Sequence, residues 1–182
     1  CNEFEARRGS KDDVFSELCF CLLTANFQAE KSILIQEKMR DDFFNLNEEE
    51  LALKLKVAGH RFWPQRAERI VLARNNIDEL FGMLEGNEFE IRDWLVCNVK
   101  GLGMKESSHF LRNIGFLNIA IIDFHIVDLL VREGVIGRPK TLNKKVYLEV
   151  EEILRDLGKM VGLNLAELDL YLWCIETGCV LK

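Results

Sequence analysis

The sequence predicts an all-α fold arranged as two helical lobes around a cleft. Apolar residues recur at three- and four-residue spacing along almost the whole chain, which is the period of an amphipathic helix. Strand-like alternation is nearly absent, and only two prolines interrupt the 182 residues. Because 48% of the residues are apolar, a substantial core is available. We expect residues 1–182 to form a single unit of two interleaved lobes, with boundaries that the sequence does not resolve.

Apolar stripes place the helices of the first half of the chain at residues 15–23, 33–39, 51–57, 67–73, 77–84 and 89–97. Asn47 is suited to cap the third of these helices, because its side chain can accept from the free N–H groups of the first turn. Pro64 fits the first turn of the fourth helix, where its missing N–H would have no partner in any case.

The second half of the chain is helical as well, with stripes at residues 104–114, 124–133, 143–157 and 165–175. Asp123 stands immediately before the second of these runs, which is a strong helix start signal. Residues 134–139 contain two glycines and a proline, and they predict the clearest loop of the chain.

The net charge of −6 argues against a protein that coats nucleic acid non-specifically, since such proteins are usually basic. The basic residues nevertheless fall into three series: Arg61, Arg66, Arg69 and Arg74; Lys100, Lys105 and Arg112; and Lys140, Lys144 and Lys145. If the series converge, they form a local positive face. Each could equally be an ordinary solvated helix face.

The six cysteines lack C-x-x-C spacing, and no group of histidines accompanies them, so no zinc site or iron–sulfur cluster is predicted. No run of about eighteen uncharged apolar residues exists, and the amino terminus lacks a signal-peptide pattern. We therefore expect no metal site, no membrane association and a cytoplasmic location.

Two glycines lie between the predicted helices that end near residue 97 and begin near residue 104. Gly101 and Gly103 can adopt backbone angles closed to other residues, so their N–H groups can converge on an anion at the start of a helix. A nucleic-acid phosphate is such an anion, and Lys100 could contact it too. Lys105 falls in the first turn of the next helix, where the helix dipole disfavours an ammonium ion and favours a nucleophilic amine.

The glycine turn with Lys105, followed by Asp123 eighteen residues later, resembles the helix-hairpin-helix DNA glycosylase superfamily. Lys105 matches the lysine that marks members with both glycosylase and AP lyase activity. The absence of four cysteines near the carboxyl end separates the chain from the iron–sulfur branch, and its small size and its ending at residues 173–182 are similar to the compact archaeal-type 8-oxoguanine DNA glycosylases. Lys100 replaces the proline common before the first glycine, so we expect a somewhat looser hairpin.

The resemblance implies that Lys105 and Asp123 are catalytic. Asp123 would stabilise positive charge on the sugar as the base leaves, and Lys105 would hold C1′ as a Schiff base before β-elimination. Taken singly, Lys105 could be a surface lysine and Asp123 only a helix cap. The expected partner is damaged double-stranded DNA, bound in the cleft by a monomer that needs no cofactor. The resemblance also implies a monovalent cation at the hairpin carbonyls.

An enzyme that acts on a base within a duplex must extrude that base and fill the space it leaves. Asn26 is similar to a superfamily residue whose amide enters the duplex, and Phe62 to an intercalating aromatic, although they could be a helix-end amide and a core ring. Asp169 and Trp173 lie four residues apart on one helix face, where they could hold a flipped purine. The resemblance implies that Lys182 also reaches this base pocket.

These inferences predict a bifunctional glycosylase/AP lyase that excises 8-oxoguanine opposite cytosine. Three alternatives stay open: a helix-hairpin-helix glycosylase for oxidised pyrimidines, a non-catalytic DNA-binding hairpin module, and an all-α protein-interaction domain. The hairpin chemistry does not separate the two lesions. Lys105 and Asp123 are the residues that distinguish an enzyme from a binding module.

Overall fold

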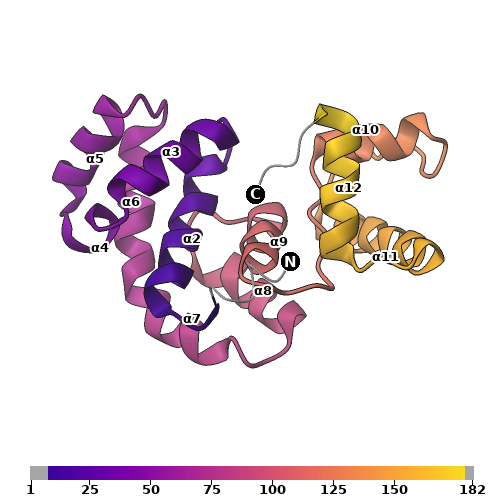
Figure 1. Cartoon of the computed structure of the whole chain (residues 1–182), viewed down its shortest axis with the longest axis horizontal. Coiled ribbons are helices and arrows are strands. Elements are labelled where there is room, and N and C mark those ends of the chain that lie inside the picture. The colour runs from indigo at the N-terminus through magenta and orange to yellow at the C-terminus, as the bar shows by residue number, and fades with distance from the viewer. Residues whose placement is uncertain (1–7, 179–182) are drawn as a thin grey trace.

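The computed structural model describes residues 8–178 as α-helices and one short 3₁₀ helix, with no strand in that range, which confirms the all-α fold class (Figure 1). The first part of the chain forms α2 (Lys11–Thr24), α3 (Ala29–Met39), α4 (Asp42–Asn45), α5 (Glu48–Val57), α6 (Trp63–Ala73), η1 (Arg74–Asn76), α7 (Ile77–Met83) and α8 (Glu88–Asn98). The second part forms α9 (Met104–Asn113), α10 (Phe124–Arg132), α11 (Lys144–Val161) and α12 (Leu165–Thr177).

The predicted helix starts are confirmed by their capping contacts. Asn47 accepts from the Glu50 N–H at 3.0 Å, and the Glu50 carboxylate accepts in return from the Asn47 N–H at 3.2 Å. Pro64 is the second residue of α6. The four-residue helix α4 was not predicted, because one turn is too short to show a helical period.

Two hydrophobic cores define two lobes (Figure 1). The first core takes its buried residues from 14–119, on helices α2 to α9, and the second takes them from 120–168, on α10 to α12 and the segment before α10. Among the described residues the two cores follow one another along the chain, and the single unit of two interleaved lobes stays a prediction. The sequence did not locate this boundary, because residues 119–122 are all apolar and all buried.

Helix α2 is the centre of the first lobe. Every residue from Val14 to Thr24 is buried, as expected for a helix that is apolar on nearly all sides. The one acidic residue among them, Glu17, accepts from the Asn113 side-chain amide at 2.7 Å. Since Asn113 is the last residue of α9, this contact fixes the carboxyl end of α9 against the core.

Helix α9 lies where the two lobes meet. It belongs to the first lobe, but Met104 at its amino end packs against the second core. In the described part of the chain, no helix is long and apolar enough to cross a membrane. No group of three or more His, Cys, Asp or Glu residues in that part is arranged to hold a metal ion.

Candidate active site

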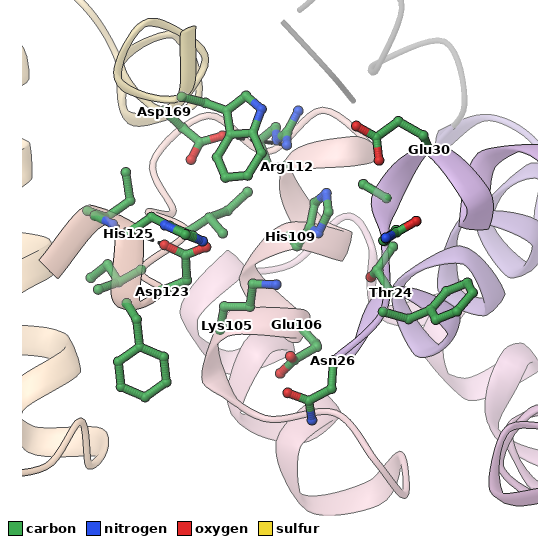
Figure 2. Close-up of a pocket in the computed structure, with 18 of the residues that line it drawn as sticks. Thr24, Asn26, Glu30, Lys105, Glu106, His109, Arg112, Asp123, His125 and Asp169 are labelled. Carbon is green, nitrogen blue, oxygen red and sulfur yellow. Dashed lines mark hydrogen bonds and ion pairs between the residues drawn. The ribbon is translucent and has the colours of Figure 1, made fainter. Parts of the chain in front are cut away.

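A cavity of about 940 Å³ lies between the lobes. Its walls come from the end of α2 and the start of α3 on one side, from α9 in the middle, and from residues 121–126 and α12 on the other side (Figure 2). This volume lies in the upper part of the range typical of small-molecule sites, so the cavity has room for a nucleobase and its sugar.

The hairpin between α8 and α9 begins at a position that strongly favours glycine. Gly101 has a φ of +99°, and a Cβ atom there would lie 2.5 Å from Cδ of Arg69. Gly103 is different, because its φ of −104° and ψ of −171° are extended angles open to any residue. The expectation that both glycines use restricted angles is therefore wrong for Gly103, which serves as the N-cap of α9.

The groups expected to contact DNA phosphates have carboxylate partners in this structure. Lys100 Nζ lies 2.6 Å from Glu68 Oε1. The Gly103 N–H donates to Glu106 Oε2 at 3.4 Å, a long and therefore weak hydrogen bond. Both groups are thus paired with carboxylates of the chain itself. The role of Gly101, Gly103 and Lys100 in DNA binding stays a prediction.

Lys105 and Asp123 line the same cavity, Lys105 from α9 and Asp123 from the start of α10 (Figure 2). Lys105 is the second residue of α9, as the sequence predicted. Asp123 is the N-cap of α10, and its Oδ1 accepts from the Ile126 N–H at 3.0 Å. This cap holds the carboxylate in one orientation toward the cavity. The structure therefore brings together an amine and a carboxylate that are eighteen residues apart in the sequence.

Two further side chains of α9 line the cavity above Lys105. His109 and Arg112 follow it at four and seven residues, so all three share one helix face (Figure 2). Neither residue was predicted to lie at the site, although this spacing was the available signal. Arg112 Nη2 lies 3.5 Å from Asp169 Oδ2, and the two side chains are 4% and 12% exposed.

Asp169 and Trp173 both line the cavity from α12, on the face that their spacing predicted. Burial raises the pKa of Asp169 to about 6; Arg112 and Lys105 oppose this increase, whereas Asp123 adds to it. The Trp173 ring meets the His125 ring edge to face, with 6.2 Å between the centroids. Lys182, the third predicted pocket residue, lies outside the described residues.

Asn26 and Phe62 are brought together by Arg61. The Arg61 guanidinium donates to the Asn26 carbonyl at 3.2 Å and lies 4.4 Å from the Phe62 ring centroid. Asn26 is exposed at the edge of the cavity with a φ of +59°, an unusual angle for a residue other than glycine.

His60 stabilises the region around Asn26 and Phe62 through both of its ring nitrogens. Its Nδ1 accepts from the Phe62 N–H at 3.1 Å, which leaves the hydrogen on Nε2 to donate to the Leu23 carbonyl at 3.0 Å. His60 therefore connects the end of α2 to the start of α6. Asn26 follows the first of these helices, and Phe62 is the N-cap of the second.

The hairpin backbone offers carbonyl oxygens, which are the hard donors that a monovalent cation prefers. Two of them already accept hydrogen bonds: the Val99 carbonyl accepts from the Leu102 N–H at 3.2 Å, and the Asn98 carbonyl from the Asn76 amide at 2.8 Å. Each carbonyl has a second lone pair that such an ion can use, and the monovalent cation stays a prediction.

A two-lobed helical fold with a hairpin lysine and a helix-capping aspartate lining one interlobe cavity is the arrangement of a helix-hairpin-helix DNA glycosylase of the lyase type. The chain belongs to the 8-oxoguanine DNA glycosylase family, because the family model with that description matches residues 1–163.

Known proteins with the same architecture are similar over nearly the full chain. The chain is 54% identical over 183 residues to the 8-oxoguanine DNA glycosylase/AP lyase of Korarchaeum cryptofilum, covering 99% of this chain and 87% of the relative. The crystal structure of the Methanocaldococcus jannaschii 8-oxoguanine glycosylase/lyase in complex with a 15mer DNA containing 8-oxoguanine is 50% identical. It has a TM-score of 0.95 and covers 100% of this chain and 89% of that one. The Thermotoga maritima 8-oxoguanine DNA glycosylase is 44% identical, with a TM-score of 0.94 over 100% and 88% of the two chains.

Proposed function

We propose that this protein excises 8-oxoguanine from double-stranded DNA and cleaves the strand at the resulting abasic site. The single observation that carries the proposal is that Lys105, directly after the hairpin, and Asp123, the N-cap of α10, line one cavity. The family membership supports it, as does the similarity to a glycosylase/lyase whose structure contains 8-oxoguanine DNA.

The first step is the departure of the base. As the bond between the base nitrogen and C1′ breaks, its electron pair leaves with the base and positive charge develops on the sugar. An ionised Asp123, held toward the cavity by its cap contact, stabilises that charge. The amine of Lys105 attacks C1′ in its neutral form and passes a proton to a base in the site, a role that we assign to Asp123 because its carboxylate lines the same cavity.

The second step is cleavage of the strand. The sugar ring opens to give a Schiff base between Lys105 Nζ and C1′. Loss of a 2′ proton sends electrons toward C3′, and the C3′–O bond breaks with departure of the phosphate. Water then releases the unsaturated aldehyde and restores the amine.

DNA binding and base recognition would use the residues around this centre. Gly101, Gly103 and Lys100 would contact the backbone, and Asn26 and Phe62 would fill the space of the extruded base. In the pocket, an ionised Asp169 would accept from the purine N1–H while Trp173 stacks on its face. Lys182 would complete the pocket from the carboxyl end.

The remaining proposed properties are the oligomeric state of the protein, its location and its need for cofactors. The protein would act as a monomer in the cytoplasm, without an organic cofactor, because Lys105 and Asp123 supply the nucleophile and the charge stabilisation. The cation at the hairpin would assist phosphate binding only. Size-exclusion chromatography with and without duplex DNA tests whether the protein is monomeric in both states.

A panel of duplexes that differ only in the lesion, each incubated with borohydride, tests substrate and mechanism together. We expect covalent trapping on 8-oxoguanine opposite cytosine, and none after Lys105→Gln. Trapping at thymine glycol with indifference to 8-oxoguanine would favour an oxidised-pyrimidine glycosylase instead. Binding of every duplex without any trapping would favour a non-catalytic module.

A further inference from the structure

Tyr147 joins separate parts of the fold through its hydroxyl group. It is 1% exposed on α11. Its oxygen lies 3.1 Å from the Ile122 N, 2.8 Å from the Ala120 carbonyl oxygen and 3.1 Å from Ser108 Oγ. Ala120 and Ile122 belong to the extended segment before α10, and Ser108 belongs to α9. One phenol therefore contacts both the segment and the helix.

The hydrogen atoms of this cluster have one consistent arrangement. A carbonyl oxygen only accepts, so the Tyr147 hydroxyl donates to Ala120. Since a phenol has a single hydrogen, the Ser108 hydroxyl and the Ile122 N–H both donate to the tyrosine oxygen. Burial raises the pKa of Tyr147 above its usual value, which keeps that hydrogen in place. All three contacts are thus satisfied at once.

A buried ion pair extends the cluster across both lobes. Arg92 on α8 donates to the two oxygens of Glu151 on α11 at 2.6 and 2.8 Å, and both side chains are 2% exposed. Arg92 also donates to Ser108 Oγ at 3.2 Å, and Glu151 accepts from the Ala120 N–H at 2.9 Å. The first lobe supplies Arg92 and Ser108, and the second supplies the others.

The cluster fixes the two sides of the proposed active site. Ala120 is held by both its N–H and its carbonyl, and Ile122 by its N–H, so the backbone is tied down immediately before Asp123. On the other side, Ser108 stands three residues after Lys105, which is one helical turn. Neither Tyr147 nor Ser108 lines the cavity itself.

We infer that Tyr147 is a positioning residue for base excision: with Ser108, its hydroxyl holds residues 120–122 against α9, and so fixes the position of Asp123 relative to Lys105. The inference rests on the proposed function, because it assigns Tyr147 a role in that reaction. Displacement of a catalytic group by about 1 Å can slow a reaction by about 100-fold, so a contact far from the substrate can control the rate.

The variants that test this role remove a hydrogen bond without removing a charge. Loss of Arg92 or Glu151 would leave its partner as a buried unpaired ion and would endanger the fold itself. Tyr147→Phe keeps the ring and removes one oxygen, and Ser108→Ala removes the serine contact. Tyr171→Phe is the matched control, because Tyr171 is 60% exposed on α12.

The experiment measures single-turnover excision of 8-oxoguanine with enzyme in excess, and separately the dissociation constant for a duplex with a tetrahydrofuran abasic analogue. We expect Tyr147→Phe to excise about tenfold or more slowly, with affinity within about twofold of wild type. Tyr171→Phe should match wild type. If the two hydroxyls act together, adding Ser108→Ala to Tyr147→Phe should slow excision by no more than about another twofold.

Two results would overturn the positioning role. One is wild-type excision by Tyr147→Phe; the other is a parallel fall of rate, affinity and melting temperature, which would indicate a merely structural contact. Borohydride trapping of the wild-type protein in the same series separates this inference from the function. If wild type is not trapped, the proposed function fails and the positioning role with it. If wild type and Tyr147→Phe are trapped equally fast, only the positioning role fails.

Discussion

Asp169 and Arg112 both line the cavity and form an ion pair that joins the two lobes, with 3.5 Å between Asp169 Oδ2 and Arg112 Nη2. Asp169 lies on α12 of the second lobe, and Arg112 lies on α9, two turns after Lys105. Because both side chains are largely buried, the pair is weakly screened by solvent. The helix that would read the base is therefore tied to the helix that carries the proposed nucleophile.

This pair predicts a pH dependence of base excision. Burial raises the pKa of Asp169 to about 6, so the carboxylate that would accept from the purine is lost as the pH falls through that value. We expect single-turnover excision by the wild-type protein to slow below about pH 6, and excision by Asp169→Asn to be slower at pH 8 without that acidic limb. Strand cleavage at a preformed abasic site, which contains no base, should lack the Asp169-dependent limb. An unchanged acidic limb in Asp169→Asn would contradict this assignment.

The same pKa predicts the opposite trend for stability. The ordinary value is 3.8, so between about pH 4 and 6 the folded state binds more protons at Asp169 than the unfolded state does. The contribution of Asp169 to the free energy of unfolding therefore falls as the pH rises through this window. Urea denaturation at several pH values should show the free energy of unfolding of Asp169→Asn rising relative to that of wild type as the pH increases through this window.

Asp123 caps α10, and in the proposed function it also stabilises charge on the sugar; one substitution can separate these two roles. Asparagine caps helices about as well as aspartate, so Asp123→Asn should change the free energy of unfolding by only a few tenths of a kcal/mol, whereas Asp123→Ala should cost about 1 kcal/mol. Both variants lack the charge that would stabilise the sugar, so both should slow base excision by about 100-fold or more. Denaturation curves and single-turnover rates check the two effects. Rapid excision by the stable Asp123→Asn protein would contradict a catalytic charge.

Local signals explain what the sequence could predict. The caps at Asn47 and Asp123 and the position of Lys105 in the first turn of α9 depend on residues within about four positions of one another. The contacts that the sequence could not predict join distant segments. Arg92 and Glu151 are 59 residues apart, and Lys100 and Glu68 are 32 apart. Their partners follow from how the lobes pack, which no local period specifies.

The glycine turn also has one feature that local sequence predicts and another that only the packed structure determines. Sequence placed the turn between the correct helices, but it could not separate the two glycines. The positive φ of Gly101 and the side chain of Arg69 above it are properties of the packed structure. Gly103 differs only because it lies at the N-cap of α9.

Alanine at the two glycines should therefore have unequal effects. Gly101→Ala combines an unfavourable φ with a Cβ that meets Arg69, so we expect a loss of about 1–3 kcal/mol in the free energy of unfolding and weaker DNA binding. In Gly103→Ala the new Cβ lies 3.3 Å from the Glu106 carboxylate, the end of a flexible side chain, so we expect a smaller loss. Thermal denaturation and duplex affinity compare the two variants. Equal destabilisation would show that both glycines are required by backbone geometry.

The ion pair between Lys100 and Glu68 predicts opposite effects of two substitutions on DNA binding. The side chains are 57% and 37% exposed, and such pairs contribute little to stability, so either substitution should leave the fold intact. Lys100→Gln removes a predicted phosphate contact and should reduce the slope of log affinity against log salt by about 0.9. Glu68→Gln releases Lys100 and removes a negative charge beside the hairpin, so it should tighten binding at low salt. Affinities for undamaged and lesion-containing duplexes, measured between 50 and 200 mM salt (about the range over which phosphate contacts dominate), check both effects. If Lys100 stays bound to Glu68 when DNA is present, Lys100→Gln will leave the salt slope unchanged, and the hairpin contact will rest on the backbone N–H groups alone.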